Sequence, residues 1–548
     1  MKQFLKVVRR SLLAVGALFI SLGALHAQTL DLTFDMSQLA NPDYNTNNVF
    51  VTFSGQSLSA TLGGTAVTLT GDLTPSSNPL TQSFSMAQIQ SAGGFTVSGA
   101  TSVVAYISYG SDTDFNNAGT TPSPVTEPTR FSTMEFTYNP AGATQGDTTY
   151  INSFGGGMNL TTYTDLAETQ VQESRSFASG VTNASIFQNL ASNTISSGAG
   201  YSSVVQTVTP GSGFYSGQSI YNRIVMPTTN INAISTGSNT AYPSFKPYVD
   251  QLITNAGGGS VATLGLIAPG ADPTVSPAQA YIKTNTGTFN YDLNYNNFQT
   301  TISSTGGAYT VTMTGTVTAV MTAGQTPNGS NPATITYTGL TVTVQLANEQ
   351  ALNAFIYGQP TPGNVVTGVT FSQSGAGWTT LTNDFGSAST AFYYRIPNDL
   401  TEGLLVGAVG STQPSGIGGL TIGQLNSAQW FANPQLTYGV AQPGSPFYNS
   451  LAEYLWDHSG GTLAGGGTFT DGGLYANSYD DRYASTLIDL YGVYGGQAQP
   501  QTAALNVSLI PDGNIAVGAV PEPGTYALIG LGVLLLGAYG VRRKRLQA

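Results

Sequence analysis

Chemistry in this chain must be done without thiols and almost without imidazoles. The 548 residues include no cysteine and two histidines, so disulfides and thiolate metal sites are excluded and no histidine cluster can hold zinc. A Ser–His–Asp triad would have to use His458, which lacks the Gly-x-Ser-x-Gly context of a nucleophile elbow. We interpret it as a surface or turn residue. Carboxylates, amides and hydroxyls remain, and we predict neither a metal nor a cofactor.

Glu135 is a carboxylate placed in an alternating run. Met134, Phe136 and Tyr138 alternate with Glu135 and Thr137, and successive side chains of a strand point to opposite faces of the sheet. The three apolar residues are therefore predicted to face the core. Glu135 and Thr137 then face the other way, into a groove. Acid–base chemistry by carboxyl groups needs a second such group, so that one gives a proton while the other takes one.

The sequence offers three candidate partners for Glu135. The segment Ile151–Phe154 can pair as the return strand of a hairpin, which would place Asn152 beside Glu135. An amide can hold a water but cannot accept its proton, and general-base help is worth about 10²–10⁴-fold in rate. Asp147, in the loop between the two strands, and Asp165 are the alternative carboxylates.

The elements that position these residues are mainly strands. Two segments alternate threonine with apolar residues, Thr310–Val320 and Ile335–Leu346. A period of two with β-branched residues is typical of half-buried antiparallel strands. Similar segments bounded by Gly, Pro, Asn and Ser clusters predict strands at Val49–Phe53, Thr65–Thr70, Val103–Tyr109 and Met134–Tyr138.

Helical patterns are few. Tyr248–Ile253 follows Pro247, a residue suited to a first helical turn. Further helices are predicted at Asp165–Phe177, Ala184–Leu190 and Asn449–Trp456, so we expect a helical insertion around 165–255. A hydrophobic content of 40% is too high for a disordered chain. The body is too long for one sandwich, and two lobes around a cleft are expected.

The first segment has the features of a secretory signal peptide over residues 1–27. Lys2, Lys6, Arg9 and Arg10 precede a mostly apolar run, and Ala24 to Ala27 offers a small residue at the cut. The run is short of the roughly 20 residues that span a bilayer. The pattern therefore predicts export.

The last segment, 520–548, has three features in order. Pro521, Glu522 and Pro523 precede an uncharged run at 525–541, and Arg542 to Arg545 form a basic cluster after it. The run is near the lower limit for a spanning helix, and the positive-inside rule keeps the basic cluster cytoplasmic. This segment resembles the PEP-CTERM sorting signal, which an exosortase reads. The resemblance implies a sorting tail with a transient membrane helix after a linker at 513–519, and a protein sorted to the cell surface or extracellular matrix.

The body between the two ends is strongly acidic. Without the four Lys/Arg of the N-terminal segment, and without the four Lys/Arg and one Glu of the tail, it holds 7 Lys/Arg and 26 Asp/Glu, a net charge of −19. Such a surface repels phosphate backbones, so nucleic acid is not an expected partner. Neutral polysaccharide or a cationic partner suits it.

Several segments of the body, in order from about Leu30 to Asp512, resemble glycoside hydrolase family 64, the thaumatin-like β-1,3-glucanases. They are Val103–Gly110, Arg130–Asn139, Tyr150–Gly155, Arg223–Pro227, Phe245–Leu252 and Tyr475–Asp481. The resemblance implies a mainly β body at 28–512, with an antiparallel β-barrel or sandwich lobe and a smaller mixed α/β lobe. A wide electronegative cleft for β-1,3-glucan would lie between them.

The same resemblance implies roles for single residues. Glu135 stands where the family has its acid, and Asn152 stands where it has an Asp. Asp480 and Asp481 lie in a Tyr-Asp-Asp turn and are either structural or line the groove with Thr137. Three functions stay open: an inverting β-1,3-glucanase, a glucan-binding protein that lost its base, and a β-rich structural component of extracellular matrix.

Overall fold

The computed structural model describes most of the body. It covers residues 29–70, 83–111, 127–138, 145–195, 204–229, 242–265, 282–286, 289–321, 333–358, 366–373, 387–443, 447–463, 466–474, 487–490, 493–494, 497–498 and 502–517. The predicted signal peptide (1–27) and sorting tail (520–548) lie outside these ranges. Within them, no helix is both long and apolar enough to cross a bilayer.

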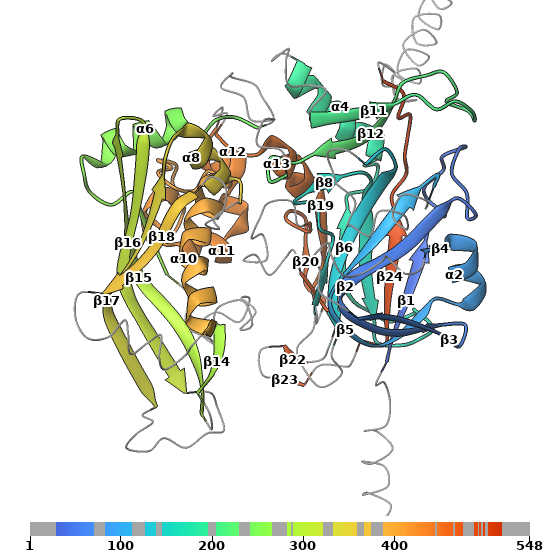
Figure 1. Ribbon diagram of the computed structural model, residues 1–548, viewed down its shortest axis with the longest axis horizontal. Helices are drawn as coiled ribbons and strands as arrows, with labels where there is room; N and C mark the ends of the chain where they lie inside the picture. Colours follow the sequence, from blue (N-terminus) through green and yellow to red (C-terminus); the bar gives the residue numbers. More distant parts are fainter. Residues whose placement is uncertain are drawn as a thin grey trace, which may run out of the picture.

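Two large sheets organise the described chain into two lobes (Figure 1). The first lobe contains a 13-stranded sheet. Its strands are β1 (Leu30–Asp35), β2 (Val49–Leu62), β3 (Thr65–Thr70), β4 (Ser83–Ser85), β5 (Phe95–Tyr109), β6 (Arg130–Tyr138), β7 (Gln145–Asp147), β9 (Met158–Tyr163), β10 (Val171–Phe177), β19 (Ser459–Thr462), β20 (Thr468–Phe469), β21 (Ile488–Asp489) and β24 (Ala504–Leu509).

The strand order of this sheet joins distant parts of the chain. It runs β20-β19-β10-β9-β24-β1-β5-β6-β7-β21, with β2 also paired to β5 and carrying β3 and β4. β1 and β24 pair in parallel, whereas β6 and its two neighbours are antiparallel. β21, at one end of the order, also contacts β10 near the other end. The sheet is therefore strongly curled.

Alternation decides which face of the curled sheet is buried. β1 and β9 bury every second residue, and Leu30, Leu32, Met158 and Leu160 are fully buried in the main hydrophobic core. Burial of such side chains contributes about 1.5–3 kcal/mol each relative to full exposure. The remaining elements of this lobe are β8 (Ser153–Phe154), β11 (Val205–Val208), β12 (Ile220–Val225), β22 (Val493–Tyr494), β23 (Gln497–Ala498), α2 (Met86–Ala92), α4 (Asn183–Ile195) and α13 (Ser450–Asp457).

The second lobe is a 6-stranded antiparallel sheet with helices packed against it (Figure 1). Its strands are β13 (Ala262–Leu264), β14 (Ile282–Thr286), β15 (Phe289–Thr305), β16 (Ala308–Met321), β17 (Thr334–Leu346) and β18 (Val366–Gln373). Its helical elements are α6 (Lys246–Ala256), α8 (Glu349–Ile356), α10 (Ser387–Leu405), η2 (Ile422–Gln424), α11 (Ser427–Ala432), η3 (Pro434–Leu436) and α12 (Tyr438–Ala441).

The mainly β fold predicted from the sequence is confirmed. All six segments with a period of two fall within strands β2, β3, β5, β6, β16 and β17. Three helices are also confirmed as α4, α6 and α13, with Pro247 in the first turn of α6 and Asn449 as the N-cap of α13.

Two predictions about element boundaries are wrong. Val171–Phe177, expected to be helical, forms strand β10 between β9 and β19. The Asp165 side chain accepts the backbone N–H groups of Thr169 and Gln170, which fixes a turn and makes β9 and β10 a hairpin. The expected insertion at 165–255 therefore contains strands as well as helices.

The predicted linker at 513–519 also begins later than expected. Ile515 is fully buried, and its carbonyl accepts the N–H of Tyr221 at 2.9 Å. The N–H of Val517 donates to the carbonyl of Ser219. The packed body therefore extends past Asp512 at least to Val517.

Candidate functional site

Glu135 lies in the middle of β6, opposite Val104 of β5 on one side and Asp147 of β7 on the other. Met134, Phe136 and Tyr138 are at most 1% exposed. Their burial confirms that they face the core. Glu135 is half-buried on the opposite face, as the alternation predicted.

Asp147 is the carboxylate that the fold brings to Glu135. The two residues are direct partners in the antiparallel register of β6 and β7, and Cβ atoms of such pairs lie about 4.5–5.5 Å apart on one face. The Thr149 hydroxyl donates to Asp147 Oδ1 at 2.6 Å. A hydrogen bond of this kind favours the ionised form of a carboxyl group.

Asn152 is not the cross-strand partner of Glu135, contrary to the predicted hairpin. The return strand is β7, and the N–H of Thr149 still bonds the carbonyl of Thr133 on β6 at 3.1 Å. Asn152 is exposed in the following bend. Its backbone carbonyl accepts the N–H of Met226 and the hydroxyl of Thr229, because the chain has by then turned toward β12.

Thr137 is on the same face as Glu135, and its hydroxyl has a structural partner. It accepts the N–H of Ser102 at 3.0 Å, at the place where β5 bulges between Ala100 and Val103. Asp165 lies in the exposed β9–β10 turn described above. Asp480 and Asp481 lie outside the described residues.

An aromatic cluster borders Glu135 on this face. Tyr106 and Phe131 are 8% and 2% exposed and pack with Val104. Burial raises the pKa of Tyr106, and the Glu135 charge raises it further. The guanidinium of Arg223 lies 4.5 Å from the Phe131 ring centroid. These rings are too buried to stack on a sugar, and they lower the dielectric beside Glu135.

Sequence reasoning missed Asp489, on the other side of β7. Asp489 pairs with Gln145, and Gln145 pairs with Thr137, so the three share the face of Glu135. Burial raises the pKa of Asp489 to about 7, with a further rise from Glu173 and an opposing effect of Arg175. No local pattern could have found it, because β21 is only 2 residues long.

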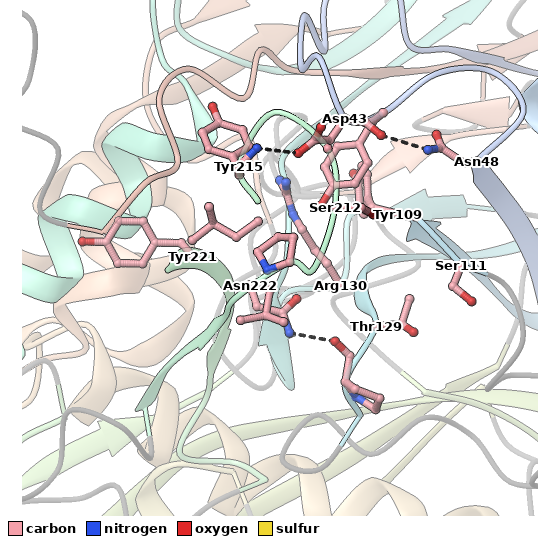
Figure 2. A pocket seen from close by; sticks show the side chains of 17 residues that line it. Asp43, Asn48, Tyr109, Ser111, Thr129, Arg130, Ser212, Tyr215, Tyr221 and Asn222 are labelled. Atoms are coloured by element: carbon pink, nitrogen blue, oxygen red, sulfur yellow. Dashed lines mark hydrogen bonds between the residues drawn. The ribbon is translucent and has the colours of Figure 1, made fainter. Parts of the chain in front are cut away.

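A second polar region is a pocket of about 460 Å³ at the ends of β5 and β11 and the starts of β6 and β12. Figure 2 shows Tyr109, Arg130, Tyr215 and Asn222 around it. The Asp43 carboxylate in its wall accepts the N–H of Tyr215 at 3.1 Å, and Asn222 donates to the carbonyl of Pro128. The described residues therefore line the pocket with tyrosine rings and polar groups, among which Asp43 is the one carboxylate.

Arg130 at the base of this pocket is neutralised by Asp512. Two hydrogen bonds of 2.9 and 2.6 Å join the guanidinium to both carboxylate oxygens, and Asn41 and Asn183 also donate to Asp512. Burial alone would lower the pKa of Arg130, but the Asp512 carboxylate raises it above its ordinary value. Since Arg130 and Glu135 stand on opposite faces of β6, the pocket is separate from the Glu135 face.

The pocket offers no pair of carboxyl groups for acid and base. His458 also takes no part in such a pair: it ends α13, stacks on Tyr454, and places Nδ1 2.8 Å from the Tyr454 carbonyl. Among the described residues, no group of three His, Cys, Asp or Glu is arranged to hold a metal ion. The face of β6 and β7 does bring two carboxyl groups, Glu135 and Asp147, directly opposite each other, an arrangement that acid–base chemistry can use.

A family model for the PEP-CTERM protein-sorting motif matches residues 519–545. This chain carries a PEP-CTERM sorting motif. The PEP-CTERM segment contains Pro521, Glu522 and Pro523, the predicted sorting residues, and lies outside the described part of the structure.

No curated protein sequence matches this chain significantly. Among solved structures, it is similar to a β-1,3-glucanase domain of family GH64 from Clostridium beijerinckii, with 11% identity and a TM-score of 0.42 over 88% of this chain and 97% of that one. It is also similar to the GH64 laminaripentaose-producing β-1,3-glucanase from Paenibacillus barengoltzii complexed with laminarihexaose, with 15% identity and a TM-score of 0.23 over 30% and 44% of the two chains.

Proposed function

We propose that this chain is an exported, surface-sorted glycoside hydrolase that cleaves β-1,3-glucan with Glu135 and Asp147 as its carboxyl groups. The observation that carries the proposal is the direct opposition of these residues on β6 and β7. Two carboxyl groups on one face, flanking the scissile bond, are what acid–base hydrolysis of a glycoside requires.

Each carboxyl group has a role suited to its surroundings. Glu135 stands beside the buried Tyr106 and Phe131, and an apolar surrounding favours the protonated form that a general acid needs. Asp147 accepts the Thr149 hydroxyl, which favours the ionised form that a general base needs.

The reaction then proceeds as a single displacement at C1 of the sugar. Glu135 gives its proton to the glycosidic oxygen as the C1–O bond breaks. Asp147 takes a proton from the water whose oxygen forms the new bond to C1. Inversion requires the two carboxyl groups to stand about 6.5–9.5 Å apart, which the opposed Glu135 and Asp147 side chains reach when they point away from each other over the groove.

The substrate class rests on the ordered segments of the body that resemble the family 64 β-1,3-glucanases. The net charge of −19 supports it, since neutral glucan is not repelled. The PEP-CTERM motif supports recognition by an exosortase-type machinery, with transient anchoring through the segment 525–541 after removal of a signal peptide at 1–27.

The test is release of reducing ends from laminarin, a soluble β-1,3-glucan, by the full-length protein. We expect Glu135→Gln to lose activity and Asp165→Asn, a matched carboxyl-to-amide change in an exposed turn, to keep it. Proton NMR of the first products should show the α-anomer. If no reducing ends are released but laminarin still retards the protein in an affinity gel, a glucan-binding protein is supported instead. If laminarin is neither cleaved nor bound, a structural matrix component is supported.

A further inference from the structure

Asp489 extends the carboxyl pair to a third strand. On the core face, Phe136, Gly146 and Ile488 stand in line across β6, β7 and β21, and Phe136 and Ile488 are at most 1% exposed. The residues next to them must then face the other way. Asp489 therefore shares the face of Glu135 and Asp147, one strand beyond Asp147 and two residues along. Residues in such a diagonal relationship lie about 7–8 Å apart, with their Cβ atoms somewhat closer.

The curl of the sheet places β10 beside Asp489. Its backbone N–H donates to Glu173 Oε2 at 3.2 Å, and Glu173 and Arg175 form an ion pair in which both residues are 2% exposed. The Arg175 guanidinium also donates to the carbonyls of Ser174, Thr462 and Leu487. The one cation beside Asp489 is thus shared among several acceptors in the described part of the lobe.

Charged groups lie around Asp489 among the described residues, and two of them, Glu173 and Arg175, shift its pKa. Glu173 and Arg175 face it from β10, Asp147 stands on the neighbouring β7, and Glu135 stands one strand further on β6. Burial raises the pKa of Asp489 to about 7, and Glu173 adds to the rise more than Arg175 opposes it. Burial and Glu173 therefore favour the protonated form of Asp489 well above the pH at which an ordinary aspartate ionises.

A protonated carboxyl group has a capacity that its ionised neighbours lack. It carries an O–H donor, whereas an ionised carboxylate can only accept. The ring and glycosidic oxygens of a glucan carry no hydrogen and can only accept. A carboxyl group that keeps its proton can therefore donate a hydrogen bond to such an oxygen. An ionised carboxylate would repel it, because both oxygens would then present only lone pairs to each other.

We propose that Asp489 is a substrate-binding residue of the glucan site, whose carboxyl group donates a hydrogen bond to a ring or glycosidic oxygen of the sugar next to the cleaved bond. This inference rests on the proposed function and adds a specific contact to it. It also makes glucan affinity decrease as Asp489 ionises.

The experiment measures binding of laminarihexaose to the full-length protein by calorimetry, in a Glu135→Gln background that prevents hydrolysis. We expect the affinity to fall about tenfold between pH 5.5 and pH 8.5, the equivalent of losing about 1.4 kcal/mol. Asp489→Asn keeps a donor that does not titrate, so it should bind equally at both pH values. Asp489→Ala should bind about fivefold more weakly at pH 5.5.

Three results would overturn the inference. If laminarihexaose binds with the same affinity at both pH values, or if Asp489→Asn keeps the pH dependence, Asp489 is not the donor and the proposed function stands. If laminarihexaose binds to no variant at either pH, the proposed function fails together with the inference. Circular dichroism of each variant separates these results from loss of folding, and Asp489→Asn decides the question where Asp489→Ala does not fold.

Discussion

Arg130 and Asp512, 382 positions apart in sequence, form a bidentate ion pair inside the first lobe. The side chains are 2% and 0% exposed, and four donated hydrogen bonds from Arg130, Asn41 and Asn183 reach the Asp512 carboxylate. The pair ties the start of β6, the strand that carries Glu135, to the segment after β24.

Removing one partner of this pair should destabilise the first lobe strongly. Asp512→Ala leaves the Arg130 guanidinium buried without its counter-charge, which costs about 3–5 kcal/mol. We expect the thermal unfolding midpoint to fall by several degrees. Lys246 and Asp250 form a contrasting pair at about 40% exposure, and Asp250→Ala should cost less than about 1 kcal/mol. Equal shifts for the two variants would contradict this account of the Arg130 pair.

Asp489 should make stability depend on pH in a defined direction. Its pKa is about 7 in the folded protein against an ordinary 3.8, so between these values the folded state binds more protons than the unfolded state. Stability contributed by this group is therefore lost as pH rises from about 4 to 7, with little change above that.

The matched variant isolates this effect. Asp489→Asn does not titrate, so its unfolding midpoint relative to the parent should increase from pH 4 to pH 7 and then stay level. Differential scanning calorimetry across that range measures it. A midpoint difference that does not change with pH would mean that Asp489 is ionised at the same pH in both states.

Thr137 is expected to matter for stability more than for substrate. Thr137→Val removes the acceptor of the Ser102 N–H at the β5 bulge, with an expected cost of about 1 kcal/mol, whereas Thr137→Ser keeps the hydroxyl. The KM for laminarin should stay the same in both variants. A KM raised in Thr137→Val with an unchanged unfolding midpoint would assign Thr137 to the glucan site.

The sorting motif predicts the fate of the mature protein. Replacing Pro521, Glu522 and Pro523 together with alanine should prevent processing by the sorting machinery while leaving the packed body unchanged, because we propose that these residues form its recognition element. Fractionation of a host with an exosortase should then show the variant held in the membrane fraction and the parent at the surface or in the medium. The same distribution for the variant and the parent would contradict a role of these three residues in sorting.

Local pattern was sufficient to predict the strands and the face of Glu135, because Met134, Phe136 and Tyr138 alternate with it. Local pattern was insufficient to predict that Asp147 on β7 is the residue opposite Glu135. β7 is only 3 residues long, Gln-Gly-Asp, and carries no alternation that could set its register against β6. The pairing of β7 with β21 joins residues more than three hundred positions apart, which a single sequence does not reveal.

At Asp165–Phe177 local pattern predicted the wrong type of secondary structure. A helix was predicted there, but the Asp165 carboxylate closes a turn, and pairing with β9 and β19 on both sides makes Val171–Phe177 a strand. Tertiary pairing outweighs weak local preference there.

The most direct test of the central claim compares Asp147→Asn with Asn152→Ala in release of reducing ends from laminarin. Glu135 faces Asp147 across β6 and β7, while Asn152 is exposed and uses its backbone carbonyl. We predict that Asp147→Asn lowers the rate by about 10²–10⁴-fold and that Asn152→Ala stays near the parent. Loss of activity in Asn152→Ala with full activity in Asp147→Asn would contradict the assignment of Asp147 as the base.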